Sequence, residues 1–267
     1  MAFATDLTNR QWALVSDLFD PPGRRGAPAL IPRQWMVNAV LYQARTGCQL
    51  RYLPAEFGPW GAVWQQFRRW RAKGVWAAAM DRIRRAACVK AGRDPEPSMD
   101  MLDSQTAKGG RSGPTFHEAG GKFGATFGAK RTLFVDYLGL PVAARVDSAR
   151  PHDSRAGRLL CEAVLPNLPR VTDVLADQGF EPLIPGVGRR HHVTVVIKAW
   201  KPKPNGFKPL EPLWRVEDCF AQLGRLGHGL APGRLRRASP HQGLTSLRPR
   251  PPDRRARHSG GGQTLLA

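Results

Sequence analysis

The sequence predicts an α/β fold in which a mixed β-sheet flanked by helices follows a small all-helical domain. Residues 1–92 consist of short amphipathic helical stretches. Residues 98–225 give the order strand, strand, strand, helix, strand, short helix, strand, helix, which is typical of a mixed sheet with helical layers. Pro95 and Pro97 lie between the two regions and indicate a linker.

The helical domain is predicted to begin with a helix within residues 7–22. Thr8 and Gln11 have the spacing of a capping box, and the pair of prolines that starts at Pro21 ends the helix. Trp12, Val15 and Phe19 are expected on its buried face. Further helices are predicted within residues 33–47, 59–74 and 76–90.

Basic side chains surround the apolar face of the helix predicted within residues 59–74. Val63, Phe67 and Trp70 face inward at helical spacing. The other sides carry Arg68, Arg69 and Arg71. Short helices with basic outer faces are typical of helix-turn-helix-like DNA-binding modules, although a solvated basic helix has the same pattern. We expect these arginines to bind DNA.

Composition supports a nucleic-acid partner and a reducing compartment. The net charge of +20 indicates a polyanion, most simply DNA or RNA. The four cysteines show no C-x-x-C spacing, which disfavours a zinc site or a disulfide framework. No apolar run approaches the ~20 residues that span a bilayer, and no signal pattern opens the chain. We expect a cytoplasmic, nucleoid-associated protein without a membrane partner.

A composition break separates residues 226–267 from the rest of the chain. This segment has eight Arg, seven Gly and five Pro, but no Val, Ile, Phe, Tyr, Trp or Met. Without large apolar groups to offset chain entropy, it is predicted to be disordered. The bias resembles GC-rich DNA translated in the wrong frame, so we interpret it as a frameshifted tail. Without it, Lys+Arg falls from 41 to 33 and Asp+Glu from 21 to 20, which leaves a net charge of +13.

Three carboxylates stand at positions that suit a metal site. Asp103 and Asp177 end predicted strands, Gly179 follows the second, and Glu217 projects from the apolar face of the last helix. Ligands collect at strand ends of open sheets. Grouped carboxylates repel one another unless a cation neutralises them, and hard oxygen ligands suit Mg²⁺ or Mn²⁺. Two such ions about 3.5–4 Å apart support phosphodiester chemistry.

Simpler interpretations exist for these residues. Each carboxylate alone could cap a turn or reach water, and only their combination with the basic charge favours a metal site. A transition-metal site could also be imagined from His152, Asp153, His191 and His192. Adjacent histidines that open a strand point to opposite faces, so we expect these four to be surface or DNA-facing groups.

From Leu7 to Arg225 the chain resembles the DDE transposases of bacterial insertion sequences, which have a ribonuclease-H-like catalytic domain. "LTNRQWALVSDLF" and "VWQQFRRWRAKGVW" resemble the helical region of that family. "DSQTAK", "GAKRTLFVDYLGLPV" and "PHDSRAG" resemble the first part of its catalytic domain. "LADQGF" resembles its second-aspartate motif, and "WRVEDCFAQLGR" its glutamate helix. The matches occur in the family's order along the chain, which makes the resemblance specific.

The resemblance implies a role for particular residues. The metal-binding catalytic triad would be Asp103, Asp177 and Glu217. Contacts to DNA phosphates would come from Lys130, Arg131 and Arg225. The implied reaction cleaves the ends of the element and joins the freed 3′-hydroxyl to target DNA, with Mg²⁺ or Mn²⁺, two ions in all. The implied partners are double-stranded DNA, both terminal inverted repeats and target, and further copies of the chain in an active homo-oligomer.

The chain also departs from the family pattern. Asp218 replaces a usual Arg, and Leu213 stands where an Arg precedes the glutamate. The basic, apolar helix that should continue past Arg225 is missing, so the frameshift interpretation predicts an inactive enzyme. Two alternatives stay open: a metal-dependent nuclease that cuts without joining, and a non-catalytic truncated product that binds DNA and represses transposition.

Overall fold

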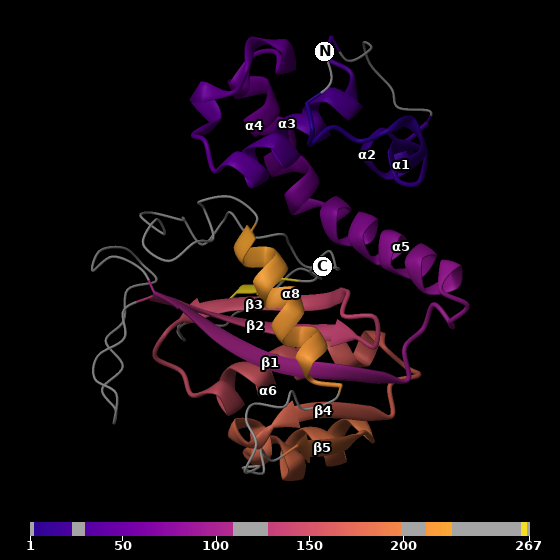
Figure 1. Ribbon diagram of the computed structural model, residues 1–267, viewed down its shortest axis with the longest axis vertical. Coiled ribbons are helices and arrows are strands. Elements are labelled where there is room, and N and C mark those ends of the chain that lie inside the picture. The colour runs from indigo at the N-terminus through magenta and orange to yellow at the C-terminus, as the bar shows by residue number, and fades with distance from the viewer. Residues whose placement is uncertain (1–2, 23–29, 109–127, 199–211, 226–262, 266–267) are drawn as a thin grey trace, which may run out of the picture.

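The computed structural model describes residues 3–22, 30–108, 128–198, 212–225 and 263–265. A helical part and a sheet part lie one beyond the other along the long axis, and the helix α5 runs between them (Figure 1). Within the described segments, every helix is too short or too polar to span a membrane.

The helical part contains the elements that the sequence predicts, with one difference. Its elements are α1 (Asn9–Ala13), α2 (Ser16–Phe19), α3 (Arg33–Thr46), η1 (Leu50–Tyr52), η2 (Ala55–Phe57), α4 (Trp60–Ala72) and α5 (Val75–Lys90). The capping box is confirmed, because the Thr8 hydroxyl accepts from Gln11 N and Thr8 N donates to Gln11 Oε1. The single helix predicted from Leu7 is wrong, since the backbone leaves helical geometry at Val15 (φ −133°) and divides it in two.

Aromatic side chains form the core of the helical part. Phe19 meets the rings of Trp70 and Trp76 edge-on, each at a centroid distance of 4.9 Å. The indole N–H of Trp70 donates to the carbonyl of Phe19 at 3.0 Å. These contacts confirm that both tryptophans belong to the core, whereas Trp35 and Trp60 are exposed. Gly47, with φ +68°, ends α3 as predicted.

A mixed six-stranded sheet forms the second part, in the order β5-β4-β1-β2-β3-β6. Its strands are β1 (Met99–Lys108), β2 (Gly128–Asp136), β3 (Pro141–Ser148), β4 (Asp173–Asp177), β5 (Thr194–Lys198) and β6 (Gln263–Leu265). β1 pairs parallel to β4, as β4 does to β5, and the remaining neighbours are antiparallel. The β-rich runs on either side of Leu138 and Gly139 predict a hairpin, which the pairing of β2 with β3 confirms, and Gly139 supplies its turn with φ +77°.

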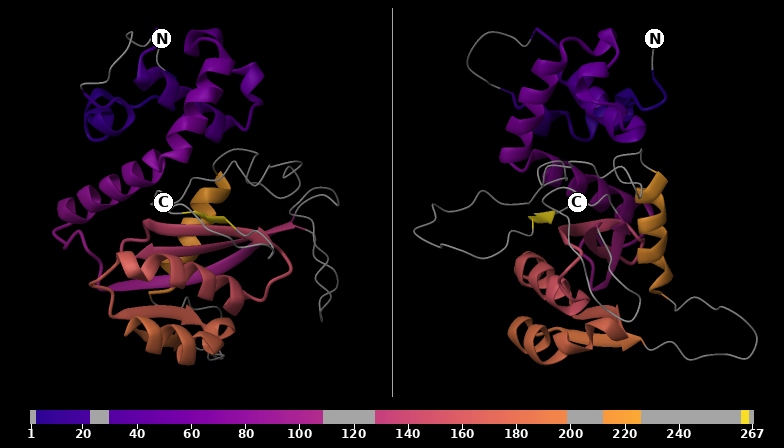
Figure 2. Two further views of the ribbon diagram at one scale, coloured as in Figure 1. Left: turned by 180° about the vertical axis from the view of Figure 1, so that it is seen from behind. Right: turned by 90° about the vertical axis from the view of Figure 1, so that its left-hand side faces the viewer.

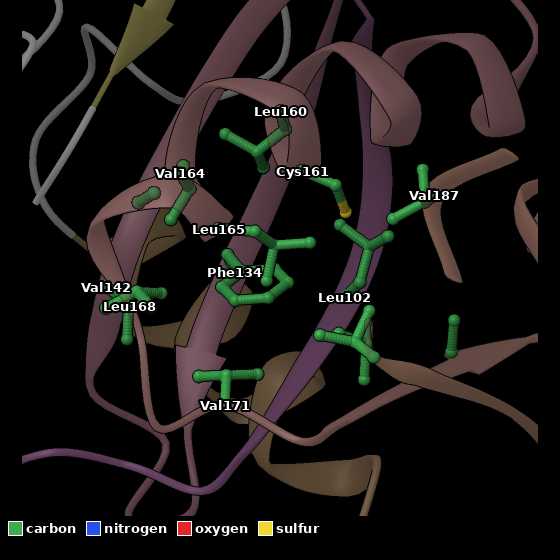
Figure 3. Packing of buried hydrophobic residues seen from close by; sticks show 14 of the residues in the cluster. Leu102, Phe134, Val142, Leu160, Cys161, Val164, Leu165, Leu168, Val171 and Val187 are labelled. Carbon is green, nitrogen blue, oxygen red and sulfur yellow. The ribbon is translucent and has the colours of Figure 1, made fainter. Parts of the chain in front are cut away.

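Helices cover both faces of this sheet (Figures 1 and 2). The remaining elements are α6 (Asp153–Val164), η3 (Leu165–Asn167), η4 (Gln178–Leu183), η5 (Ile184–Gly188), α7 (Arg189–His191) and α8 (Trp214–Arg225). Side chains alternate between the faces, so that Leu102 and Phe134 pack in the cluster under α6, whereas Met101 and Leu133 pack under α8. Figure 3 shows the first cluster, in which Leu160 and Val164 of α6 lie over Phe134.

Three sequence interpretations are corrected by the fold. The strand predicted to end at Asp103 continues to Lys108, because residues 104–108 pair with β2 in an antiparallel ladder. Asp153 and Ser154 are N-cap candidates by residue type, but the N-cap of α6 is His152, whose ring nitrogen accepts from Ser154 N. His191 and His192 do not open a strand: the first ends α7, and the second has a left-handed backbone (φ 55°).

Most of the cysteines are buried, and the structure describes only three residues of the segment after Arg225. Scattered cysteines are expected to be small buried hydrophobic groups, and Cys88, Cys161 and Cys219 are indeed buried free thiols, whereas Cys48 is half-buried. Most of the segment predicted to be disordered, 226–262 and 266–267, lies outside the described residues. Gln263–Leu265 form a short edge strand against β3, which the composition did not indicate.

Candidate active site

Asp103 and Asp177 lie side by side on neighbouring strands. The parallel register pairs Leu102 of β1 with Ala176 of β4, so the next residue on each strand is an aspartate. Met101 and Leu175, two positions earlier, pack under α8. Because side chains alternate along a strand, both aspartates face the α8 side of the sheet.

Asp177 is held by the loop that follows β4. The backbone N–H of Gly179 donates to Asp177 Oδ1 at 3.0 Å. A Cβ on Gly179 would lie 3.2 Å from that oxygen, so a larger residue would push the loop away from the carboxylate. Partial burial raises the pKa of Asp177 and the nearby charge of Asp153 raises it further, whereas the Gly179 hydrogen bond and His152 lower it.

Of the predicted ligands Asp103 and Asp177, Asp103 has the more strongly raised pKa. Burial raises its pKa to about 7, and the negative charges of Asp177, Glu217 and Asp153 add to the increase. The hydrogen bond that its Oδ1 accepts from Ser104 N, at 2.6 Å, opposes this. The negative charges of three other carboxylates therefore act on Asp103, which is typical of a site that binds a cation.

Glu217 reaches this site from α8, but not from the buried face of that helix. Leu213, Val216 and Phe220 form the buried face, together with Cys219. Glu217 itself is exposed, so its predicted position on the apolar face is wrong. Helix α8 crosses β1 and β2 (Figure 1). The negative charge of Glu217 therefore still raises the pKa of Asp103.

Asp153 is the residue that sequence reasoning set aside as a surface group. Its Oδ1 accepts hydrogen bonds from Lys130 Nζ at 2.6 Å and from Ser104 Oγ at 2.5 Å. The motif "PHDSRAG" resembled the family, but the motif alone could not show that Asp153 lies against the strand that carries Asp103. Lys130, Ser104 and Asp153 are far apart in sequence and meet only in the fold.

The predicted DNA contacts have different surroundings. Lys130 is buried and ion-paired with Asp153, so its ammonium group is already occupied within the protein. Arg131 is half-buried, donates to Gln105 Oε1 and lies 5.9 Å from the centre of the Phe220 ring. Its Nε and Nη1 have no hydrogen-bond partner among the described residues. Arg131 therefore suits a phosphate contact better than Lys130 does.

The remaining arginines lie on helices of either part. Arg68 and Arg69 are exposed on α4, and Arg71 is half-buried there. Burial and the nearby Arg68 lower the pKa of Arg71. Arg225 is the last residue of α8, and its side chain lies outside what the structure describes. DNA contacts by all of these arginines stay predictions.

The chemistry of the site fits a hard divalent cation. Asp103 and Asp177 offer oxygen ligands from adjacent strands, and neither carboxylate forms an ion pair with another described residue. In the described part of the chain, no three carboxylate, imidazole or thiol groups already converge into a metal cage. The donor set is thus appropriate for Mg²⁺ or Mn²⁺, and the side chains would have to close around the ion.

A mixed sheet with helices on both faces and aspartates on the neighbouring strands β1 and β4 defines the class of the protein: a ribonuclease-H-like α/β domain preceded by a helical region. Residues 101–250 match the family model described as "Transposase DDE domain". Residues 7–80 match a second model, described as "Putative transposase of IS4/5 family". The chain therefore belongs to the DDE transposases of insertion sequences. No curated protein and no solved structure gives a significant match.

The longer match extends beyond Arg225 to residue 250. It therefore enters the segment in which the composition predicts a frameshifted tail. The frameshift and the loss of activity that it implies stay predictions.

Proposed function

We propose that this transposase cleaves the ends of its insertion sequence and joins the freed 3′-hydroxyl to target DNA, with Asp103, Asp177 and Glu217 as the ligands of two divalent cations. The observation that carries the proposal is the placement of Asp103 and Asp177 on neighbouring strands, both facing the helix that carries Glu217. Asp103 and Asp177 are 74 residues apart along the chain, and the pairing of β1 with β4 places them on neighbouring strands, which supports the proposal.

The protein's own groups would prepare the site in defined ways. Asp103 and Asp177 fix one side of it from the rigid sheet, and Glu217 approaches from the helix above. Gly179 N orients the Asp177 carboxylate through its hydrogen bond. Asp103, whose pKa is about 7, must lose its proton to act as a ligand, so cation binding and deprotonation are coupled. Arg131 offers N–H donors to a phosphate of the bound strand.

The two steps are both phosphoryl transfers. In the first, water attacks the phosphorus at the element end, the P–O3′ bond breaks and a 3′-hydroxyl is released. In the second, that 3′-oxygen attacks a target phosphodiester, so a new P–O bond replaces the one that breaks. Asp103, Asp177 and Glu217 would hold Mg²⁺ or Mn²⁺, which would supply activation of the attacking oxygen and stabilisation of the leaving one.

Cleavage and joining can be measured on labelled DNA. The substrate would be a duplex that carries the inverted repeat flanking the gene, mixed with supercoiled target DNA and Mg²⁺ or Mn²⁺. The full-length protein should nick the duplex at the repeat and join it to the target. Asp177→Ala should abolish both products and retain binding of the repeat.

Asp173→Ala is the matched control, because Asp173 lies on the same strand at its opposite end. This variant should cleave as the parent does. Cleavage without joining would favour a nuclease. Binding without cleavage would favour the inactive product that the frameshift interpretation predicts, which could act as a repressor. Unchanged cleavage by Asp177→Ala would overturn the assignment of the site.

A further inference from the structure

Asp153 connects three elements of the catalytic domain at a single carboxylate. It begins α6, and its Oδ1 accepts hydrogen bonds from Lys130 of β2 and Ser104 of β1. Ser104 directly follows Asp103 on β1 but points to the opposite face of the sheet. Asp153 thereby fastens the first turn of α6 to the strand segment that carries Asp103.

The second oxygen of Asp153 faces the loop that holds Asp177. A Cβ on Gly179 would lie 3.9 Å from Asp153 Oδ2 and 3.2 Å from Asp177 Oδ1, so both carboxylates border the same glycine. The N–H of Gly179 is the donor that orients Asp177. Asp153 consequently lies between the backbone that carries Asp103 and the backbone that orients Asp177.

Lys130 supplies the positive charge that neutralises Asp153 between the two aspartates. Its side chain is only 8% exposed, whereas that of Asp153 is 41% exposed. A buried ammonium group needs a partner, and the charge of Asp153 next to two other carboxylates also needs one. The pair satisfies both needs. Because Asp153 is partly exposed, the pair is weak evidence for stability, and its position beside the site suggests that it serves the geometry of the site.

We propose that Asp153 is a positioning residue, held by Lys130 and Ser104, which sets the spacing between the Asp103 and Asp177 carboxylates when they bind divalent cations. The proposal rests on the proposed function, because it concerns the same metal site. Asp153 acts through Ser104 and Gly179 and is not itself assigned as a ligand.

A positioning role for Asp153 predicts a change in the preference between Mg²⁺ and Mn²⁺, which a general loosening of the fold would not cause. Mg²⁺ requires nearly ideal octahedral geometry and short oxygen contacts. Mn²⁺ takes the same carboxylate oxygen ligands but tolerates larger departures from ideal coordination geometry. A site whose two aspartates are no longer held at a fixed spacing should therefore lose more affinity for Mg²⁺ than for Mn²⁺.

The test uses the purified full-length protein and the metal ions alone. Free Mn²⁺ is measured by electron paramagnetic resonance during titration, and Mg²⁺ affinity follows from displacement of bound Mn²⁺. Asp153→Asn should lower the Mg²⁺ affinity by about tenfold or more, as is typical when a group that orients ligands is lost. The Mn²⁺ affinity should fall less, so the ratio of the two affinities changes.

Two further variants keep the test decisive. Asp153→Asn leaves Lys130 buried without its partner, which could unfold the protein, so the double variant Lys130→Met with Asp153→Asn removes both charges together. Ser104→Ala removes one hydrogen bond and retains the pair, and it should cause a smaller change in the same direction. Glu162→Gln is the matched control, because Glu162 is an ion-paired carboxylate farther along α6.

The outcomes separate this proposal from the proposed function. A folded Asp153→Asn or double variant with parental Mg²⁺ affinity would overturn the positioning role. Equal losses for both ions would also overturn it, because they would indicate a general loosening. If the parent bound no Mn²⁺, or if Asp177→Asn bound it as well as the parent, the metal site and the proposed function would fail together.

Discussion

Strand β1 takes part in two pairs of carboxylates that differ in nearly every respect. Asp100 lies opposite Asp136 of β2, and Asp103 lies beside Asp177 of β4. Because three positions separate Asp100 from Asp103, the pairs face opposite sides of the sheet. Asp100 and Asp136 are 0% and 1% exposed, whereas Asp177 is open to solvent.

The buried pair is neutralised from within the protein. Asp136 Oδ1 accepts from the backbone N–H groups of Leu138 and Leu140, and its Oδ2 lies 3.7 Å from Arg84 Nη1 of α5. Burial raises the pKa of Asp100 well above its usual value, and the charge of Asp136 adds to this, so Asp100 is expected to be protonated. Arg84 also pairs with Asp81 at 2.8 Å, so its guanidinium group is shared between Asp81 and Asp136.

The pair next to α8 has no such internal balance. Within the described residues neither Asp103 nor Asp177 forms an ion pair, and both have raised pKa values. A pair of acids on adjacent strands can therefore be neutralised in one of two ways. An arginine of the covering helix can pair with it, or a cation can bind to it from solution. The two pairs differ in the helix that covers them. Helix α5 places Arg84 next to Asp136, whereas within the described residues no arginine of α8 forms an ion pair with Asp103 or Asp177.

The largest expected difference between the pairs concerns catalysis. Asp103→Asn should lower DNA cleavage by about 10⁴-fold or more, because it removes a metal ligand. Asp100→Asn should leave cleavage within about twofold of the parent, because the amide replaces a protonated acid of the same shape. Initial rates of nicking of the labelled repeat duplex measure both effects. Equal losses in the two variants would show that the pairs do not have separate roles.

The second expected difference concerns stability. Arg84→Met should destabilise the protein by about 3–5 kcal/mol, because it leaves the Asp136 carboxylate buried without its cation. Arg85→Met, on the same helix, should cost less than about 1 kcal/mol, since Arg85 is 38% exposed and its pairs with Asp81 and Glu96 are partly solvated. Urea unfolding of both variants provides the comparison. A small effect of Arg84→Met would mean that Asp136 does not depend on this guanidinium.

The smallest expected effect is a dependence of stability on pH. Without metal, the pKa of Asp103 is about 7 in the folded state and near 3.8 in the unfolded chain. The folded state retains the proton across this window and the unfolded state releases it, so the Asp103 contribution to stability falls as pH rises from about 4 to 7.

Asp103→Asn should remove this part of the pH dependence. Urea midpoints in chelator at about pH 5 and about pH 8 would give a smaller difference for the variant than for the parent. The raised pKa of Asp100 contributes in the same direction and stays in both proteins. An unchanged difference would indicate that Asp103 is not the titrating group.

The sequence predicted the order of the elements because local signals were strong. The Thr8 capping box, the glycine after α3 and the apolar runs of the strands each depend on neighbouring residues, and all are confirmed. The length of β1 was underestimated, because its second half is polar and is held by the ladder with β2. Such pairing is a long-range contact and leaves no local pattern.

The strand positions of Asp103 and Asp177 were predicted in outline, whereas the surroundings of Lys130 and Glu217 were missed for the same reason. Asp177 ends an apolar strand and lies two residues before Gly179, a pattern that marks the end of a strand. By contrast, Lys130 appeared to be a basic group for DNA until its partner, 23 residues away, became visible. Glu217 matched the apolar spacing of its helix, but the sheet beneath buries a slightly different stripe, which leaves Glu217 exposed.

The most direct test of the central claim is to locate a bound cation. Crystals of the full-length protein soaked in Mn²⁺ would be measured for anomalous scattering at the manganese edge. We expect a peak between β1 and β4, with oxygens of both Asp103 and Asp177 within roughly 2.0–2.6 Å. A peak elsewhere, with these two carboxylates unligated, would contradict the account.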